Sequence, residues 1–459
     1  MLKLRENEKL YNLWRMLTLL MVFSMFVYLL LYQFAPNYFG RLFNLVYKLL
    51  PLVALPCFLL MRGLKDGAEM RLLFAFCLLA SLLRFIDGSY REEAILIIVL
   101  GLWMCLPCLA AASLADSKLR YRLLDAVSIV VTTAYTLIGL PCIYTGITGN
   151  TIYHPLTGVS MCELIGGRLY LFYINCNSVS GWYFMMLLLL FYLFFRSKKL
   201  WQRLLLVLEM LICYTCLALT YGRGGMLAFA VGMGMLAAAL GLKHLPLKKH
   251  WHRLAAVLLL VCAVSPLAYK SFQLGTGAIS AVSNSIYAQQ QESPEEKSEP
   301  AAQSNAEALN SRGMGSSGRT TLWIASLECV LEEPIRLLTG RSMPMEETNA
   351  YIKEHYPQET ARYGNRPNHH NTYLELFQMF GLPGFLLMMA FFVLLTVKMI
   401  RLYFAPEAEI YLKVIIMMLS GIMVYNLFES TLFCIYDMRT VVFCVLAGYV
   451  LAAERELAQ

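Results

Sequence analysis

Apolar residues gather into runs along the chain, and short basic or polar stretches separate one run from the next. About 20 apolar residues in a helix match the thickness of the hydrocarbon core of a bilayer. The pattern therefore predicts an all-α polytopic membrane protein with about twelve transmembrane helices. The predicted spans lie near residues 13–33, 43–62, 71–86, 93–114, 124–145, 179–195, 201–220, 225–242, 254–270, 373–397, 409–427 and 436–453.

A polar segment over residues 271–371 separates the ninth predicted span from the tenth. Within it, residues 289–310 are rich in Gln, Glu, Ser, Pro and Ala and lack an apolar period, so we expect them to be disordered. Apolar residues at helical spacing over 320–338 predict an amphipathic helix that ends near Pro334. The segment is thus expected to be a large loop with short amphipathic helices.

Basic residues fall in every second loop, which by the positive-inside rule places both termini in the cytoplasm. The 271–371 loop then faces outward, and the first apolar run is a retained span rather than a signal peptide. The chain divides into four parts. They are N-terminal transmembrane helices over 1–165, further transmembrane helices over 166–270, the extracytoplasmic loop over 271–371, and C-terminal transmembrane helices over 372–459.

The composition agrees with this class, since 59% of the residues are hydrophobic. The net charge of +8 is explained by the cytoplasmic loops, and no basic soluble domain suggests nucleic-acid binding. Most of the 13 cysteines lie inside predicted spans, where we read them as small core residues. Cys162 and Cys176 share an outward loop, and whether they form a disulfide stays open.

Charged side chains at the outer ends of spans are the functional candidates, because charge beside a bilayer core is costly. Arg319 is expected in the first turn of the amphipathic helix, where free backbone N–H groups favour an anion such as phosphate. His370 directly precedes a helix predicted to begin at Thr372, with Thr372 and Glu375 at capping-box spacing. The dipole of that helix favours a neutral imidazole. Lipid-headgroup contact is the alternative for both residues.

Arg223 lies among three glycines at the outer end of the seventh span, where the chain either approaches a phosphate or makes a tight turn. Arg168, Asn175 and Asn177 precede the sixth span on the same side, as sugar or diphosphate ligands or as helix caps. Glu429 ends the eleventh span and needs a partner such as one of the arginines. The chain has no Asp-x-Asp and no phosphate-loop motif, so we expect neither a metal nor a cofactor.

These elements, taken in order, resemble the O-antigen ligase and polymerase superfamily of bacterial membrane glycosyltransferases, over residues 166–459. Two positions depart from the family pattern: Gly222 stands where Ser is common, and Cys176 where Pro is common. The matching elements are Gly167-Arg168 with Asn175-Cys176-Asn177, Thr220-Tyr221-Gly222-Arg223-Gly224-Gly225, Gly318-Arg319 with Trp323, and His370-Asn371-Thr372-Tyr373-Leu374-Glu375 followed by Gly381-Leu382-Pro383-Gly384.

The resemblance implies metal-independent, inverting transfer of a glycan from an undecaprenyl-diphosphate-linked donor to an acceptor hydroxyl, outside the bacterial cytoplasmic membrane. His370 is the implied general base, with His369 as its rival, and Arg223 and Arg319 are the implied diphosphate clamp. The implied substrate-binding residues are Arg168, Asn175, Asn177, Tyr221, His369, Tyr373 and Glu429.

The implied acceptor is a hydroxyl on a glycan, a lipid or a protein, and the implied partners include membrane lipids, a flippase and a chain-length regulator. A lipid-linked oligosaccharide flippase or other transporter is the alternative, which expects ionisable residues deep in several spans. A scaffold without chemistry would tolerate loss of His370 and Arg319. The sequence does not separate polymerase from ligase, nor does it give the glycan, the direction of growth or the oligomeric state.

Overall fold

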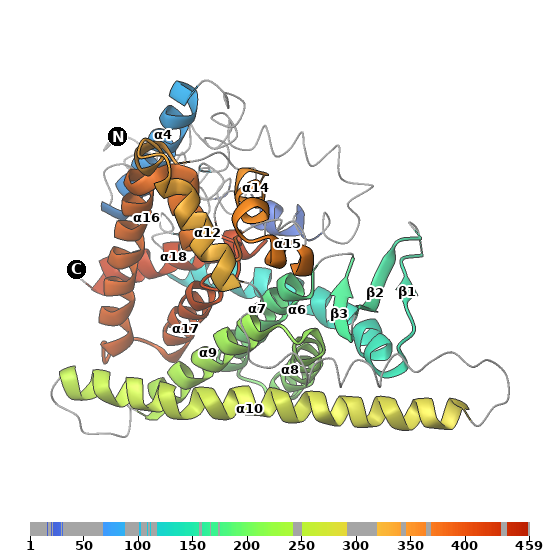
Figure 1. Cartoon of the computed structure of the whole chain (residues 1–459). Helices are drawn as coiled ribbons and strands as arrows, with labels where there is room; N and C mark the ends of the chain where they lie inside the picture. Colours follow the sequence, from blue (N-terminus) through green and yellow to red (C-terminus); the bar gives the residue numbers. More distant parts are fainter. Residues whose placement is uncertain are drawn as a thin grey trace.

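The computed structural model is mostly helical and describes residues 68–87, 117–155, 158–165, 167–172, 175–241, 250–291, 319–340, 346–363, 369–432 and 438–457, with residues 16, 20, 22–28, 30, 101, 108 and 111 (Figure 1). The described helices are α4 (Ala68–Asp87), α6 (Ser117–Thr148), α7 (Cys176–Arg196), α8 (Leu200–Thr220), α9 (Arg223–Gly241), α10 (His250–Gln291), α12 (Arg319–Leu331), α13 (Arg336–Thr339), α14 (Glu346–His355), α15 (Pro357–Tyr363), α16 (Thr372–Phe404), α17 (Ile410–Tyr425) and α18 (Met438–Leu457).

Six described helices are long and apolar enough to cross a membrane, which supports a multi-pass membrane protein. The shorter α17 is apolar as well. The spans expected near 43–62 and 93–114 lie almost wholly outside the described residues, and that near 13–33 lies there in part. The count of twelve spans therefore stays a prediction. The six candidate spans are Lys118–Thr148, Cys176–Arg196, Leu200–Thr220, Arg223–Gly241, Ala255–Ile279 and Thr372–Phe404.

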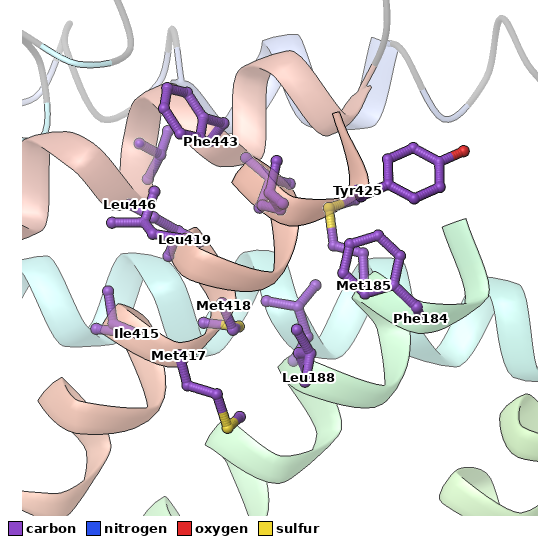
Figure 2. Packing of buried hydrophobic residues seen from close by; sticks show 14 of the residues in the cluster. Phe184, Met185, Leu188, Ile415, Met417, Met418, Leu419, Tyr425, Phe443 and Leu446 are labelled. Atoms are coloured by element: carbon purple, nitrogen blue, oxygen red, sulfur yellow. The ribbon is translucent and has the colours of Figure 1, made fainter. Parts of the chain in front are cut away.

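Helix α7 lies at the centre of the bundle and contacts α6, α8, α9, α17 and α18. Leu and aromatic side chains fill all of its faces, as expected of a helix surrounded by others. Figure 2 shows Phe184 and Leu188 of α7 packed against Met418 and Tyr425 of α17. The Tyr425 hydroxyl points away from this apolar cluster.

A small antiparallel sheet stands beside the end of α6, in a region where the sequence analysis expected no strands. Its strands are β1 (Ile152–Tyr153), β2 (Ser160–Ile165) and β3 (Arg168–Leu171), in the order β1-β2-β3. Buried and less buried residues alternate along β3, as in a sheet with one covered face. The β2–β3 hairpin pairs Ile165 with Arg168 and so fixes where Arg168 stands.

Helix α10 is longer than expected, because it continues past residue 270 to Gln291 along one edge of the molecule (Figure 1). The first three residues of the insert expected to be disordered, 289–291, belong to this helix, so that expectation is wrong for them. The rest of the insert, 292–310, lies outside the described residues. The amphipathic helix is present as α12 and ends before Pro334. The sequence predicts one buried stripe of Leu322, Trp323, Leu327, Val330 and Leu331. The structure differs: Leu322 and Val330 are buried, whereas Leu327 and Leu331 are exposed.

Helix α16 begins at Thr372 as predicted, but the N-cap is Asn371. The Asn371 side chain accepts hydrogen bonds from the backbone N–H groups of Tyr373 and Leu374, each at 3.0 Å. The capping box expected from Thr372 is wrong, because the Thr372 hydroxyl instead donates to Asn426. Farther on, Gly381 has φ +62° and kinks α16 where the α13 backbone comes so close that a Cβ would not fit.

Candidate functional site

The candidate residues gather where several helices end at the same side of the bundle. Helices α7, α9, α16 and α18 begin there, while α8 and α17 end there. Hydrogen bonds join these ends: Tyr425 at the end of α17 donates to the carbonyl of Asn177 at the start of α7, at 2.7 Å. We call this side of the bundle the site end.

The start of α16 is locked to the turn that follows α17, residues 426–432. Thr372 donates from its backbone N–H to the Asn426 carbonyl at 3.0 Å, and from its hydroxyl to the Asn426 side chain at 2.6 Å. The backbone N–H of Asn371 donates to the Ser430 hydroxyl at 3.1 Å. These bonds hold two segments, distant in sequence, in one fixed arrangement.

Glu429 joins the two residues singled out most strongly by the sequence. Its Oε2 lies 2.9 Å from Nδ1 of His370, and its Oε1 lies 2.7 Å from a guanidinium nitrogen of Arg319. Glu429 and His370 are buried, while the Arg319 side chain is about one-fifth exposed. The expectation that Glu429 takes an arginine partner is confirmed, and that partner is Arg319.

The charges around Glu429 keep it ionised. Burial opposes the charge, but the His370 hydrogen bond and the charges of His370, Arg319 and Arg439 outweigh burial and lower the pKa of the Glu429 carboxyl. An ionised carboxylate only accepts hydrogen bonds, so Nδ1 of His370 carries the proton in that contact. Whenever the ring is neutral, its other nitrogen, Nε2, carries the lone pair.

The backbone at His370 adopts φ +51°, the left-handed region that a residue with a Cβ rarely occupies. The conformation turns the chain just before the Asn371 cap and directs the ring to Glu429. Strained backbone conformations of this kind cluster at functional sites.

His369 is buried like its neighbour but differs from it in hydrogen bonding. Its ring is buried and neither nitrogen has a hydrogen-bond partner among the described residues. Burial, together with the nearby His370, lowers the pKa of His369 to about 3. Its backbone carbonyl accepts a hydrogen bond from the Trp323 indole of α12 at 2.9 Å. Of the two rings, His370 is the one whose nitrogen contacts a carboxylate among the described residues.

The glycine-rich element is a tight turn between α8 and α9. Tyr221 has φ +49°, and α9 begins two residues later at Arg223. A Cβ at Gly225 would lie 2.7 Å from the backbone oxygen of Ser180, so glycine permits close packing against α7. Arg223 is exposed and makes no ion pair or hydrogen bond with the described residues.

Arg223 nonetheless stands beside the turn that holds Glu429. A Cβ built on the next residue, Gly224, would lie 3.3 Å from Cβ of Phe428, which precedes Glu429. The sequence-predicted residues Arg223, Arg319 and His370 are thereby gathered around the 426–432 turn.

A second group of predicted residues surrounds Arg168 of β3. Its guanidinium donates to the Asn177 side chain at 2.7 Å and to the Thr220 carbonyl at 3.1 Å. The Asn175 side chain accepts from the backbone N–H of Asn177 at 2.9 Å and caps α7. These residues hold the sheet, α7 and the α8–α9 turn together. Asn175 takes the capping role that the sequence left open, and substrate binding by Arg168 and Asn177 stays a prediction.

Arg439 is a site-end residue that the sequence analysis did not single out. It is buried in the first turn of α18, and it donates to the Tyr425 hydroxyl at 3.0 Å and the Ser178 carbonyl at 3.3 Å. Through Tyr425 it links the Arg168 group to the surroundings of Glu429. The available signal was an arginine inside a predicted span, a costly position that needs a reason.

Tyr373 turns toward α17 and donates its hydroxyl to the Met423 carbonyl at 3.0 Å, so the structure places it in helix packing. Among the described residues, no group of three or more His, Cys, Asp or Glu side chains could hold a metal ion. Metal independence remains a prediction.

A comparison with known families gives a match over part of the chain. Residues 208–389 match the family described as O-antigen ligase, which confirms the resemblance to the O-antigen ligase and polymerase superfamily. The matched region contains Arg223, Arg319 and His370, whereas Arg168 and Glu429 lie outside it. No curated protein matches the chain in a sequence search.

Proposed function

We propose that the protein is a membrane glycosyltransferase of cell-surface polysaccharide assembly, an O-antigen or capsule-type polymerase or ligase. It transfers or polymerises a glycan from an undecaprenyl-diphosphate-linked donor onto an acceptor hydroxyl, at the outer face of the bacterial cytoplasmic membrane. The observation that carries the proposal is Glu429, which joins His370 to Arg319 in a chain with an O-antigen ligase match.

His370 acts as the general base in this proposal. Glu429 accepts the Nδ1 proton and orients the ring, so Nε2 takes the proton of the acceptor hydroxyl as that oxygen attacks. The carboxylate also stabilises the imidazolium that forms, as the third member of a catalytic triad does. The arrangement contributes about 10²–10⁴-fold in rate.

Arg319 and Arg223 neutralise the diphosphate while charge builds on the leaving oxygen. Arg319 holds Glu429 through one nitrogen and retains further N–H donors, and the exposed Arg223 stands at the N-terminus of α9. Each well-placed donor is worth about 2.7–4 kcal/mol in such a role. A diphosphate leaves without protonation, so direct displacement needs no second acid and gives inversion at the anomeric carbon.

The alternative is a lipid-linked oligosaccharide flippase or other transporter. A transporter holds its substrate near the bilayer midplane, between helices that open to either side. Here Arg319, His370 and Glu429 are joined at one end of the bundle, which favours chemistry at a single face.

The test is glycan transfer by purified protein in detergent and chelator, from a polyprenyl diphosphate donor extracted from the native host. Wild type is compared with His370→Ala and Arg319→Ala, each verified as folded. Product from wild type, with inverted configuration and loss in both variants, supports the proposal. Equal product from His370→Ala, or a retained anomeric configuration, contradicts the mechanism.

A further inference from the structure

Two cysteine side chains meet where α6 reaches the small sheet. Sγ of Cys142 lies 3.3 Å from Sγ of Cys162, and both side chains are fully buried. Bonded sulfurs stand about 2.05 Å apart, so a closing motion of about 1.2 Å would join them. In the structure Cys142, Cys162 and Cys176 are all free thiols. Cys176, whose pairing with Cys162 the sequence left open, lies at the start of α7 and donates to the Asn175 side chain, whereas the sulfur that contacts Cys162 is that of Cys142.

We propose that Cys142 and Cys162 form a disulfide in the mature protein and that this bond staples the sheet to the bundle. Cys162 lies in β2, the central strand, opposite Ile152 of β1 and Leu171 of β3. A covalent bond at this strand would fix the hairpin that carries Arg168. The inference rests on the outward placement of the site end in the proposed function, because disulfides persist on the oxidising side of a membrane.

The bond forms by thiol–disulfide exchange with a disulfide-bearing oxidant of the extracytoplasmic side. One thiolate attacks the donor disulfide and makes a mixed disulfide, and the second displaces the donor as a dithiol. The two cysteines lose two protons and two electrons, and the donor gains them. The contact with Cys142, together with burial, raises the pKa of the Cys162 thiol, which makes this thiol slow to react in the folded protein.

Cys216 of α8 is the rival for Cys142. It lies close to Cys142, and its thiol points to the Gly139 carbonyl at 3.5 Å. Cys162 is the better candidate, because its Sγ lies 3.3 Å from Sγ of Cys142 and the bond would close a chain loop from residue 142 to residue 162.

The test maps thiols in membranes from the native host, denatured in excess N-ethylmaleimide without reductant. Chymotrypsin suits the digestion, because no Lys or Arg lies between residues 142 and 162, whereas Tyr144 and Tyr153 do. The proposal expects a linked pair of peptides containing Cys142 and Cys162, two hydrogens lighter than the free pair. Maleimide on both cysteines, or a link from Cys142 to Cys216, overturns it.

Matched variants test what the bond does. Cys162→Ala should lower the apparent melting temperature by about 5 °C or more, whereas Cys176→Ala, which removes a buried thiol but no proposed disulfide, should lower it less. Equal shifts would overturn the stapling role. Mapping needs no glycan donor, so free thiols in protein that transfers glycan would overturn the disulfide and leave the proposed function standing.

Discussion

The two ends of the helix bundle carry charges in different ways. At the end opposite the site, Asp125 accepts two contacts from Arg196, at 3.1 and 2.8 Å, and one from the Tyr192 hydroxyl at 2.7 Å. Lys398 similarly contacts Glu454 at 2.8 Å and Glu69 at 3.3 Å. These pairs tie helix to helix, and both sides of each contact are satisfied within the protein.

At the site end one buried carboxylate contacts both the proposed base and an arginine. Glu429 holds both His370 and Arg319, and the backbone at His370 has a positive φ. Arg223 has no ion-pair partner among the described residues. Charges that are neutralised by a partner within the protein stabilise a fold. Charges that are held beside a strained backbone and partly exposed are suited to bind a ligand and react with it. The predictions below compare the two ends through matched variants.

The largest effect is expected from the adjacent histidines. His370→Gln removes the proposed base and should lower the rate of transfer by about 10²–10⁴-fold. His369→Gln should change it by less than about tenfold, because a base with a pKa near 3 contributes little near neutral pH. Transfer assays at equal amounts of folded protein measure both. A greater loss in His369→Gln would reverse the assignment.

The next effect concerns two exposed arginines on the α8 and α9 helices. Arg223→Ala should lower kcat/KM for the diphosphate donor by about 10²–10³-fold if the guanidinium acts on the leaving group. Arg203→Ala is the control, since Arg203 stands near the opposite end of α8 and contacts the Ser197 carbonyl. Equal activity of the two variants would remove Arg223 from the site.

The third prediction is a pH dependence of stability. The folded pKa of His369 is lowered to about 3 from an ordinary value near 6.5, so the folded state excludes a proton that the unfolded state binds. Its stabilising contribution is complete above about pH 6.5 and falls as the pH drops toward 3, by about 2 kcal/mol at pH 5. Denaturation in detergent from pH 4 to 8 should show this fall, and His369→Gln should reduce it.

The smallest expected effect is the difference in stability loss between variants of two buried tyrosines. Tyr425→Phe removes an acceptor for Arg439 and a donor to Asn177, and should cost about 1.5 kcal/mol of stability. Tyr403→Phe, at the opposite end, removes only a bond to the Met235 carbonyl and should cost about 1 kcal/mol. Melting temperatures in one detergent compare them. Transfer activity should fall more in Tyr425→Phe.

The sequence predicted the parts of this arrangement that depend on local pattern. Apolar runs predicted the helices from α6 to α9, and a carboxylate at a span end predicted a partner for Glu429. The start of α16 at Thr372 was predicted correctly from the spacing of Thr372 and Glu375, although the residue that caps the helix is Asn371. Each inference needs only the residues within a few turns and the cost of buried charge.

The rest depends on contacts between segments far apart in sequence. The sheet next to α6 forms because β2 pairs with β3, and the contact of Cys142 with Cys162 follows from the packing of this sheet against α6. The Thr372 hydroxyl left the expected capping role because Asn426, 54 residues away, lies beside it. The hydrogen bonds from Arg439 to Tyr425 and from Tyr425 to Asn177 of α7 likewise have no signal in the neighbouring sequence.

The most direct test of the difference between the two ends is the rate of transfer in a pair of isosteric variants, Glu429→Gln and Asp125→Asn. Both remove one carboxylate charge and keep the side-chain shape. The account predicts that Glu429→Gln lowers the rate by about 10²–10⁴-fold while remaining folded, and that Asp125→Asn transfers at nearly the wild-type rate with a lower melting temperature. Equal rates in the two variants would contradict it.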